Sequence, residues 1–168
     1  TITNLLSEVK SATTEIVITD PVYIEMNFGS SLTNSDFTLI SDAGNDSYLY
    51  VEVDQNSRRD LNTVQNEVAD VFTTYFNTSN LKLGQLVSLK DIQQSILEVD
   101  GVNAFSTRRE YKGTTIVDET LSFAVYNPIY ETADYNITQQ DINLDFFKFP
   151  YFKDVTTVQN RITVVRQG

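Results

Sequence analysis

Residues 60–77, DLNTVQNEVADVFTTYFN, constrain the fold more than any other part of the chain. Their apolar side chains recur at the spacing of an α-helix and form one continuous stripe. Asp60 precedes the first of them and is a suitable N-cap. The stripe consists of Leu61, Val64, Val68, Val71, Phe72, Tyr75 and Phe76. Such a stripe must be covered, and we expect a sheet of the same domain to cover it rather than a partner protein.

A second helix is predicted over residues 88–100. Ser88 and Asp91 are spaced as in a capping box, in which the serine hydroxyl accepts a hydrogen bond from the backbone three residues later. Gly101 is expected to end the helix, because glycine adopts the left-handed conformation with little strain. The buried side of this helix is predicted to comprise Leu89, Ile92, Ile96 and Val99.

Extended runs precede and follow the two helices. Residues 22–28 alternate between apolar and polar side chains, and residues 47–54 form a second predicted strand. Residues 102–110 and 115–127 are expected to pair as a hairpin around the turn Tyr-Lys-Gly-Thr, until Asn127-Pro128 stops the second strand. We therefore expect an α+β fold, with a mixed or antiparallel sheet and both helices packed on one of its faces.

The chain length of 168 residues fits a single domain. Residues 1–20 are expected to be a linker or an N-terminal arm, and residues 21–168 the domain itself. Because the first residue is Thr1 and no signal peptide is visible, we expect the chain to be a piece of a longer protein.

Composition and charge narrow the possible partners. Asp and Glu total 23 against 12 Lys and Arg, which gives a formal net charge of −11. A surface of this sign repels phosphate backbones, so no nucleic acid partner is expected. No apolar run approaches the roughly 20 residues needed to span a bilayer, so no membrane partner is expected either.

The residues that usually carry catalysis are absent or badly placed. The chain has no histidine and no cysteine, which removes the commonest general base and the thiolate metal ligands. Ser7 and Lys10 match Ser-x-x-Lys, but the companion Lys-Thr-Gly is missing. Asp141 opens a stretch that lacks the glycine and the closing glutamate of a calcium loop. Glu67 and Asp70 lie on one solvated helix face and are expected to share one environment, unlike a catalytic pair. We therefore predict no enzyme activity, no metal and no cofactor.

An ordered set of residues in and between the two helices carries a resemblance to a known family. The set comprises Tyr75-Phe76, Leu83-Gly84-Gln85, Ser88, Ile92, Ile96, Val99 and Gly101-Val102. In this order the residues resemble the baseplate J-like family of contractile-tailed phages. The whole chain is similar to the C-terminal part of a larger wedge protein of that family. The resemblance spans roughly residues 22–105 and implies a J-like core at about 22–125, with a C-terminal extension at about 126–168.

The resemblance implies a structural function. Family members are baseplate wedge subunits that join neighbours into a ring around the tail hub and transmit the rearrangement that triggers sheath contraction. They are virion components, assembled in the host cytoplasm, and they are not enzymes. The implied partners are further copies of the chain, as a homodimer or in ring contacts, and other wedge proteins. The alternative is a ligand- or surface-binding module of a larger bacterial extracellular protein.

The stretch DFFKFPYF, residues 145–152, is the candidate interface. Strand alternation places Phe147, Phe149 and Tyr151 on one face, and Phe146 and Phe152 on the other. A strand with one buried face does not need aromatic residues on both sides, so either the domain covers both faces or one face meets a partner. The full set of candidate interface residues is Phe146, Phe147, Phe149, Tyr151, Phe152, Tyr126, Tyr130 and Tyr135.

Overall fold

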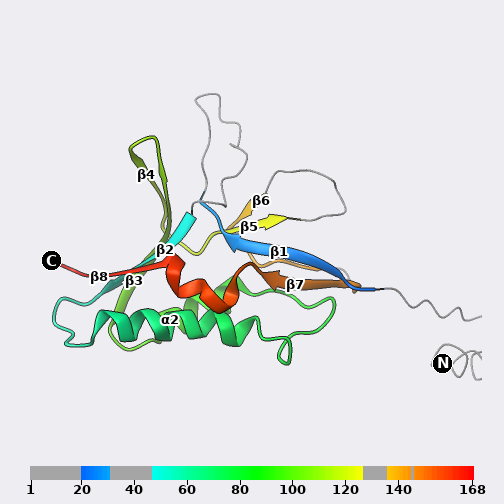
Figure 1. Ribbon diagram of the computed structural model, residues 1–168, viewed down its shortest axis with the longest axis horizontal. Helices are drawn as coiled ribbons and strands as arrows, with labels where there is room; N and C mark the ends of the chain where they lie inside the picture. The colour runs from blue at the N-terminus through cyan, green and yellow to red at the C-terminus, as the bar shows by residue number, and fades with distance from the viewer. Residues whose placement is uncertain (1–19, 31–46, 127–135, 145) are drawn as a thin grey trace, which may run out of the picture.

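A computed structural model describes residues 20–30, 47–126, 136–144 and 146–168 of the chain. These residues form two mixed sheets of four strands each, two α-helices and a 3₁₀ segment (Figure 1). The predicted α+β fold class is confirmed. The predicted stop at Asn127-Pro128 and the predicted N-terminal linker, apart from Asp20, lie outside the described residues.

The first sheet, here called the β1 sheet, has the strand order β6-β5-β1-β7. Its strands are β1 (Val22–Phe28), β5 (Phe123–Tyr126), β6 (Asn136–Thr138) and β7 (Lys148–Phe152). β5 is antiparallel to both of its neighbours, whereas β7 runs parallel to β1.

The second sheet, the β2 sheet, has the order β4-β3-β2-β8. Its strands are β2 (Ser47–Val53), β3 (Val102–Tyr111), β4 (Thr114–Asp118) and β8 (Ile162–Arg166). β3 is antiparallel to β2 and β4, whereas β8 runs parallel to β2. The two sheets therefore have the same pattern of strand directions.

The expectation of one sheet is wrong, because the run predicted as one strand at 115–127 is divided between two sheets. The hydroxyl of Thr107 accepts a hydrogen bond from the backbone N–H of Ser122 (3.0 Å) and donates one to the carbonyl of Thr120 (3.1 Å). The hydroxyl of Ser122 donates to the carboxylate of Asp118 (2.9 Å). These bonds satisfy the polar groups of a bend, so the chain can leave the β2 sheet and enter the β1 sheet.

The first predicted helix is α2 (Leu61–Tyr75), and its N-cap is confirmed. The Asp60 carboxylate accepts a hydrogen bond from the backbone N–H of Thr63 at 2.9 Å. The apolar stripe faces the inside of the domain, as predicted, with Val64, Val68 and Phe72 fully buried.

The second helix is α3 (Leu89–Leu97), and only half of the predicted capping box forms. The Ser88 hydroxyl accepts from the backbone N–H of Asp91 (3.1 Å), as predicted. The N–H of Ser88 donates to the Tyr75 hydroxyl (2.7 Å) instead of the Asp91 side chain. Tyr75 therefore connects the end of α2 to the start of α3.

Gly101 has the positive φ expected of it, +93°, but it lies in a turn beyond the end of α3. A Cβ atom at this position would approach the Ser57 hydroxyl to 2.9 Å. The positive φ therefore favours glycine here, and a larger residue would also have to displace the Ser57 hydroxyl.

A cluster of phenylalanine rings forms the centre of the core. Its members are Phe28, Phe72, Phe76, Phe123 and Phe152, with neighbouring ring centroids 5.1 to 6.5 Å apart. The rings come from β1, β5, β7 and the C-terminal end of α2. Buried residues of the β2 sheet and of α3 continue the same core, so both sheets and both helices share one apolar interior.

A partly buried arginine joins the two sheets beside this core. Arg161 ends the 3₁₀ segment η2 (Val155–Arg161), which contains a break at Thr157. Its guanidinium donates hydrogen bonds to the Asn27 side chain on β1 and to the Ser47 carbonyl on β2. It also lies 5.7 Å from the centroid of the Phe28 ring.

We predict that Phe152→Ala strongly destabilises the protein, because it removes a fully buried ring from the phenylalanine cluster. Such truncations cost about 3–5 kcal/mol. At about 2–4 °C per kcal/mol for a domain of this size, the melting temperature should fall by roughly 10 °C or more. The matched control is Phe146→Ala, because the Phe146 side chain is 82% exposed and should change the melting temperature little. Equal effects of the two substitutions in thermal denaturation would show that Phe152 is not a core residue.

We predict that Tyr75→Phe lowers stability by about 1–3 kcal/mol at pH 7, because the partly buried N–H of Ser88 loses its acceptor. Burial raises the pKa of Tyr75 above the ordinary value of 10.0. The neutral phenol therefore stabilises the fold fully below about pH 10, and that contribution is lost as the pH rises through the raised pKa. The difference between wild type and variant in urea denaturation should narrow above pH 10. A difference that grows with pH would contradict this assignment.

Candidate functional site

The pairing of β7 with β1 determines which aromatic residues of the C-terminal stretch face the core. Pro150 pairs with Ile24, and Phe152 pairs with Met26, all of which are buried. Successive side chains of a strand point to opposite faces, so Tyr151 points away from the core. The prediction that Phe152 is an interface residue is therefore wrong.

The strand register places four aromatic residues on the face of the β1 sheet opposite Ile24 and Met26: Tyr23, Tyr126, Phe149 and Tyr151, of which Phe149 also packs against the core cluster. We call them the outer aromatic face. Tyr23 pairs with Phe149 across β1 and β7, and their ring centroids are 5.9 Å apart in an edge-to-face arrangement. Glu25 lies in register with both Tyr151 and Tyr126.

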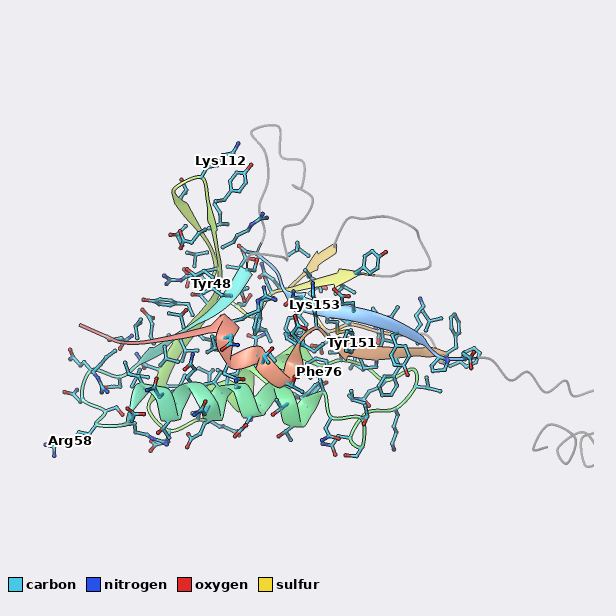
Figure 2. All side chains as sticks on the ribbon, viewed as in Figure 1. Tyr48, Arg58, Phe76, Lys112, Tyr151 and Lys153 are labelled. Atoms are coloured by element: carbon cyan, nitrogen blue, oxygen red, sulfur yellow. The ribbon has the colours of Figure 1, made fainter. Side chains whose placement is uncertain are left out.

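Two members of this face are substantially exposed. Tyr23 is 58% exposed and Tyr151, labelled in Figure 2, is 45% exposed, whereas Phe149 and Tyr126 are half-buried. Tyr23 is absent from the residues predicted as an interface. The alternation of residues 22–28 could have identified it, because it places Tyr23 on the polar side of β1 together with Glu25.

The segment that leads into β7 adds further exposed apolar side chains. The rings of Phe146 and Phe147 lie edge to face, 5.4 Å apart, and Phe146 is the more exposed. The backbone N–H of Gly84 donates to the carbonyl of Lys148 (3.0 Å), which places the Leu-Gly-Gln turn beside the start of β7. Leu83 and Leu86 of that region are about half exposed, at 54% and 45%.

Of the remaining predicted interface residues, Tyr130 and Tyr135 lie outside the residues that the structure describes.

The two carboxylates on the outer side of α2 have different surroundings, contrary to the expectation of one shared environment. Glu67 accepts two hydrogen bonds from the guanidinium of Arg59, at 2.7 and 2.9 Å. These bonds raise the pKa of Arg59. Asp70 is exposed, and its carboxylate makes no hydrogen bond or ion pair with any residue that the structure describes.

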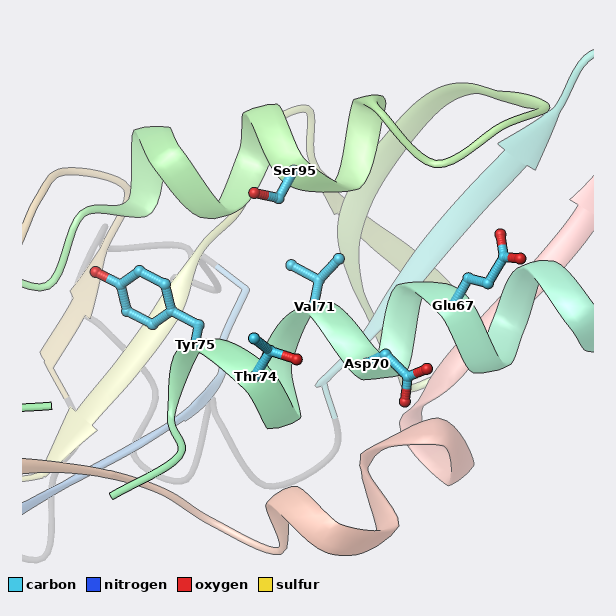
Figure 3. A pocket seen from close by; sticks show the side chains of 6 residues that line it. All are labelled: Glu67, Asp70, Val71, Thr74, Tyr75 and Ser95. Atoms are coloured by element: carbon cyan, nitrogen blue, oxygen red, sulfur yellow. The ribbon is translucent and has the colours of Figure 1, made fainter. Parts of the chain in front are cut away.

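A groove separates α2 from α3 (Figure 3). Its volume is about 360 Å³. Figure 3 shows Ser95 of α3 across from Val71 of α2, and the lining residues are Glu67, Asp70, Val71, Thr74, Tyr75 and Ser95. The groove thus combines an apolar floor with carboxylates at its rim.

The described residues hold no group of three or more side chains suited to bind a metal ion. Within the same residues, no helix has the length and apolar character needed to cross a membrane.

No protein-family model matches the chain, and no curated protein matches it.

Proposed function

We propose that the chain is a structural, subunit-joining module of a phage tail baseplate wedge, and that it contacts its neighbours through the outer aromatic face. The observation that carries this proposal is the exposure of Tyr23 and Tyr151 on a sheet face that also presents Phe149 and Tyr126. Aromatic residues are enriched at protein interfaces, where they supply a large contact area with few rotatable bonds.

The assignment to a baseplate is supported by how the residues of the family pattern interact. The Tyr75 hydroxyl accepts from the N–H of Ser88, and the Gln85 side chain accepts from the N–H of Lys82 (2.9 Å). Gly84, with a φ of +67°, donates to Lys148 at the start of β7. The stretch of the pattern from Tyr75 to Ser88 is therefore held by hydrogen bonds within itself and to β7.

This stretch suits a module that transmits movement. Its turn, between the two helices, is hydrogen-bonded to β7, the strand that carries Phe149 and Tyr151. A displacement of a neighbour docked on the outer aromatic face would reach α2 and α3 through these hydrogen bonds. Contiguous packed networks of this kind can couple distant surfaces. This is the physical basis on which we assign the module a role in ring assembly and in the rearrangement that precedes sheath contraction.

The proposed partners are further copies of the chain and other wedge proteins, in the virion and during assembly in the host cytoplasm. The proposal includes no enzyme activity and no cofactor. The net charge of −11 does not favour nucleic acid or an anionic membrane as a partner.

We predict that the purified chain self-associates at high micromolar concentration and that Tyr23→Ser combined with Tyr151→Ser weakens association at least about tenfold, as expected for buried aromatic anchors. Sedimentation equilibrium measures the effect. Because both side chains are exposed in the single chain, the melting temperature at low protein concentration should change little. Leu97→Ser is the matched control, since Leu97 is an equally exposed apolar residue on α3.

A chain that remains monomeric throughout would contradict the proposed function and favour the ligand- or surface-binding alternative. Equal weakening by the tyrosine pair and by the Leu97 control would mean that general surface hydrophobicity drives the association, and that the outer aromatic face is not its site.

A further inference from the structure

The groove between α2 and α3 fits a side chain with an apolar stem and a positive charge. Val71 and the Tyr75 ring supply apolar surface, and Thr74 and Ser95 supply hydroxyl groups. Glu67 is already bound to Arg59, but the Asp70 carboxylate has no partner within the described part of the chain. A cation at the α2 rim of the groove would therefore meet an available carboxylate.

The hairpin of β3 and β4 carries a group of this description at its tip. Lys112 and Gly113 both have positive φ, +47° and +78°, as in the two-residue turns that suit hairpins. Two cations lie near the Tyr111 ring, with the Arg109 guanidinium 5.5 Å and the Lys112 ammonium 5.1 Å from its centroid. Glu110 also lies near the tip, but it accepts hydrogen bonds from the hydroxyls of Tyr48 and Thr115.

The hairpin tip projects from the body of the protein. Figure 1 shows the hairpin on the side of the molecule opposite α2, and Figure 2 labels Lys112 at its end. A Cβ atom built on Gly113 would meet nothing within 4 Å. The tip of one copy therefore does not reach the groove of the same copy, so a contact between tip and groove would join two molecules.

We infer that the β3–β4 hairpin tip of one copy docks into the α2–α3 groove of a second copy, with Lys112 paired to Asp70. Two molecules that each carry a net charge of −11 repel each other, and a contact that sets a basic projection against an acidic groove offsets part of that repulsion. The contact joins different surfaces of the two copies, and such head-to-tail contacts build rings or filaments. The inference rests on the proposed function and adds a second contact between copies to the one at the outer aromatic face.

Charge exchange tests this contact by sedimentation equilibrium. Lys112→Glu and Asp70→Lys should each weaken association at least about tenfold, because each sets like charges together. The combined variant, and an equimolar mixture of the two single variants, should recover the wild-type association. Both side chains are exposed, so melting temperatures should verify that every variant is folded. Arg58→Glu is the control: it is exposed, makes the same change in net charge as Lys112→Glu, and should leave association unchanged.

The sign of the Asp70→Lys effect separates local pairing from overall charge. This substitution reduces the net negative charge, so relief of general repulsion alone would strengthen association. Strengthening, or failure of the combined variant and the mixture to recover, overturns the hairpin contact. If wild type associates and only the tyrosine variants weaken it, the hairpin contact is wrong and the proposed function stands. A monomeric wild type overturns both.

Discussion

The packing of the phenylalanine cluster is the interaction on which the rest of the structure depends. Its rings come from β1, α2, β5 and β7, which are far apart in the sequence. Each fully buried ring contributes about 1.5–3 kcal/mol through its removal from water. The cluster also fixes the orientation of β7. With Phe152 inside, the two-residue period of a strand requires Tyr151 to point outward, and a register slip of one residue would exchange the two faces. The core thus determines which aromatic residues remain available to a partner.

The elements that local periodicity defines were predictable from the sequence. The stripe of residues 60–77, the Asp60 cap and the alternation of residues 22–28 all correspond to observed features. The division into two sheets was not predictable, because the bend after β4 depends on the Thr107 hydroxyl, which belongs to another strand. The role of Tyr75 was hidden for a similar reason. Its position in the sequence predicts a buried residue of the apolar stripe. Its hydroxyl also accepts the hydrogen bond from the N–H of Ser88, thirteen residues away, that the Asp91 side chain would accept in a complete capping box.

The candidate interface was predicted in part. A run with aromatic residues on both faces does not indicate by itself which face is inside, because either register would bury phenylalanine. The pairing of β7 with β1 determines which face is inside: Phe152 lies in the core, and Tyr151 lies on the outer face. The same pairing adds Tyr23, which lies 126 residues before Phe149 in the chain but edge to face with its ring. Contacts of this kind arise only from tertiary structure.

The central claim, that the outer aromatic face is a contact surface while the opposite side of β7 is core, can be tested by thiol labelling. The chain has no cysteine, so a single introduced thiol reports one position. Glu25→Cys places the probe between Tyr151 and Tyr126, and Thr163→Cys places a control on an exposed position of β8. We expect the thiol at 25 to react more slowly at high than at low protein concentration, whereas the thiol at 163 reacts equally at both. Equal reaction rates at position 25, or equal slowing at both positions, would contradict the claim.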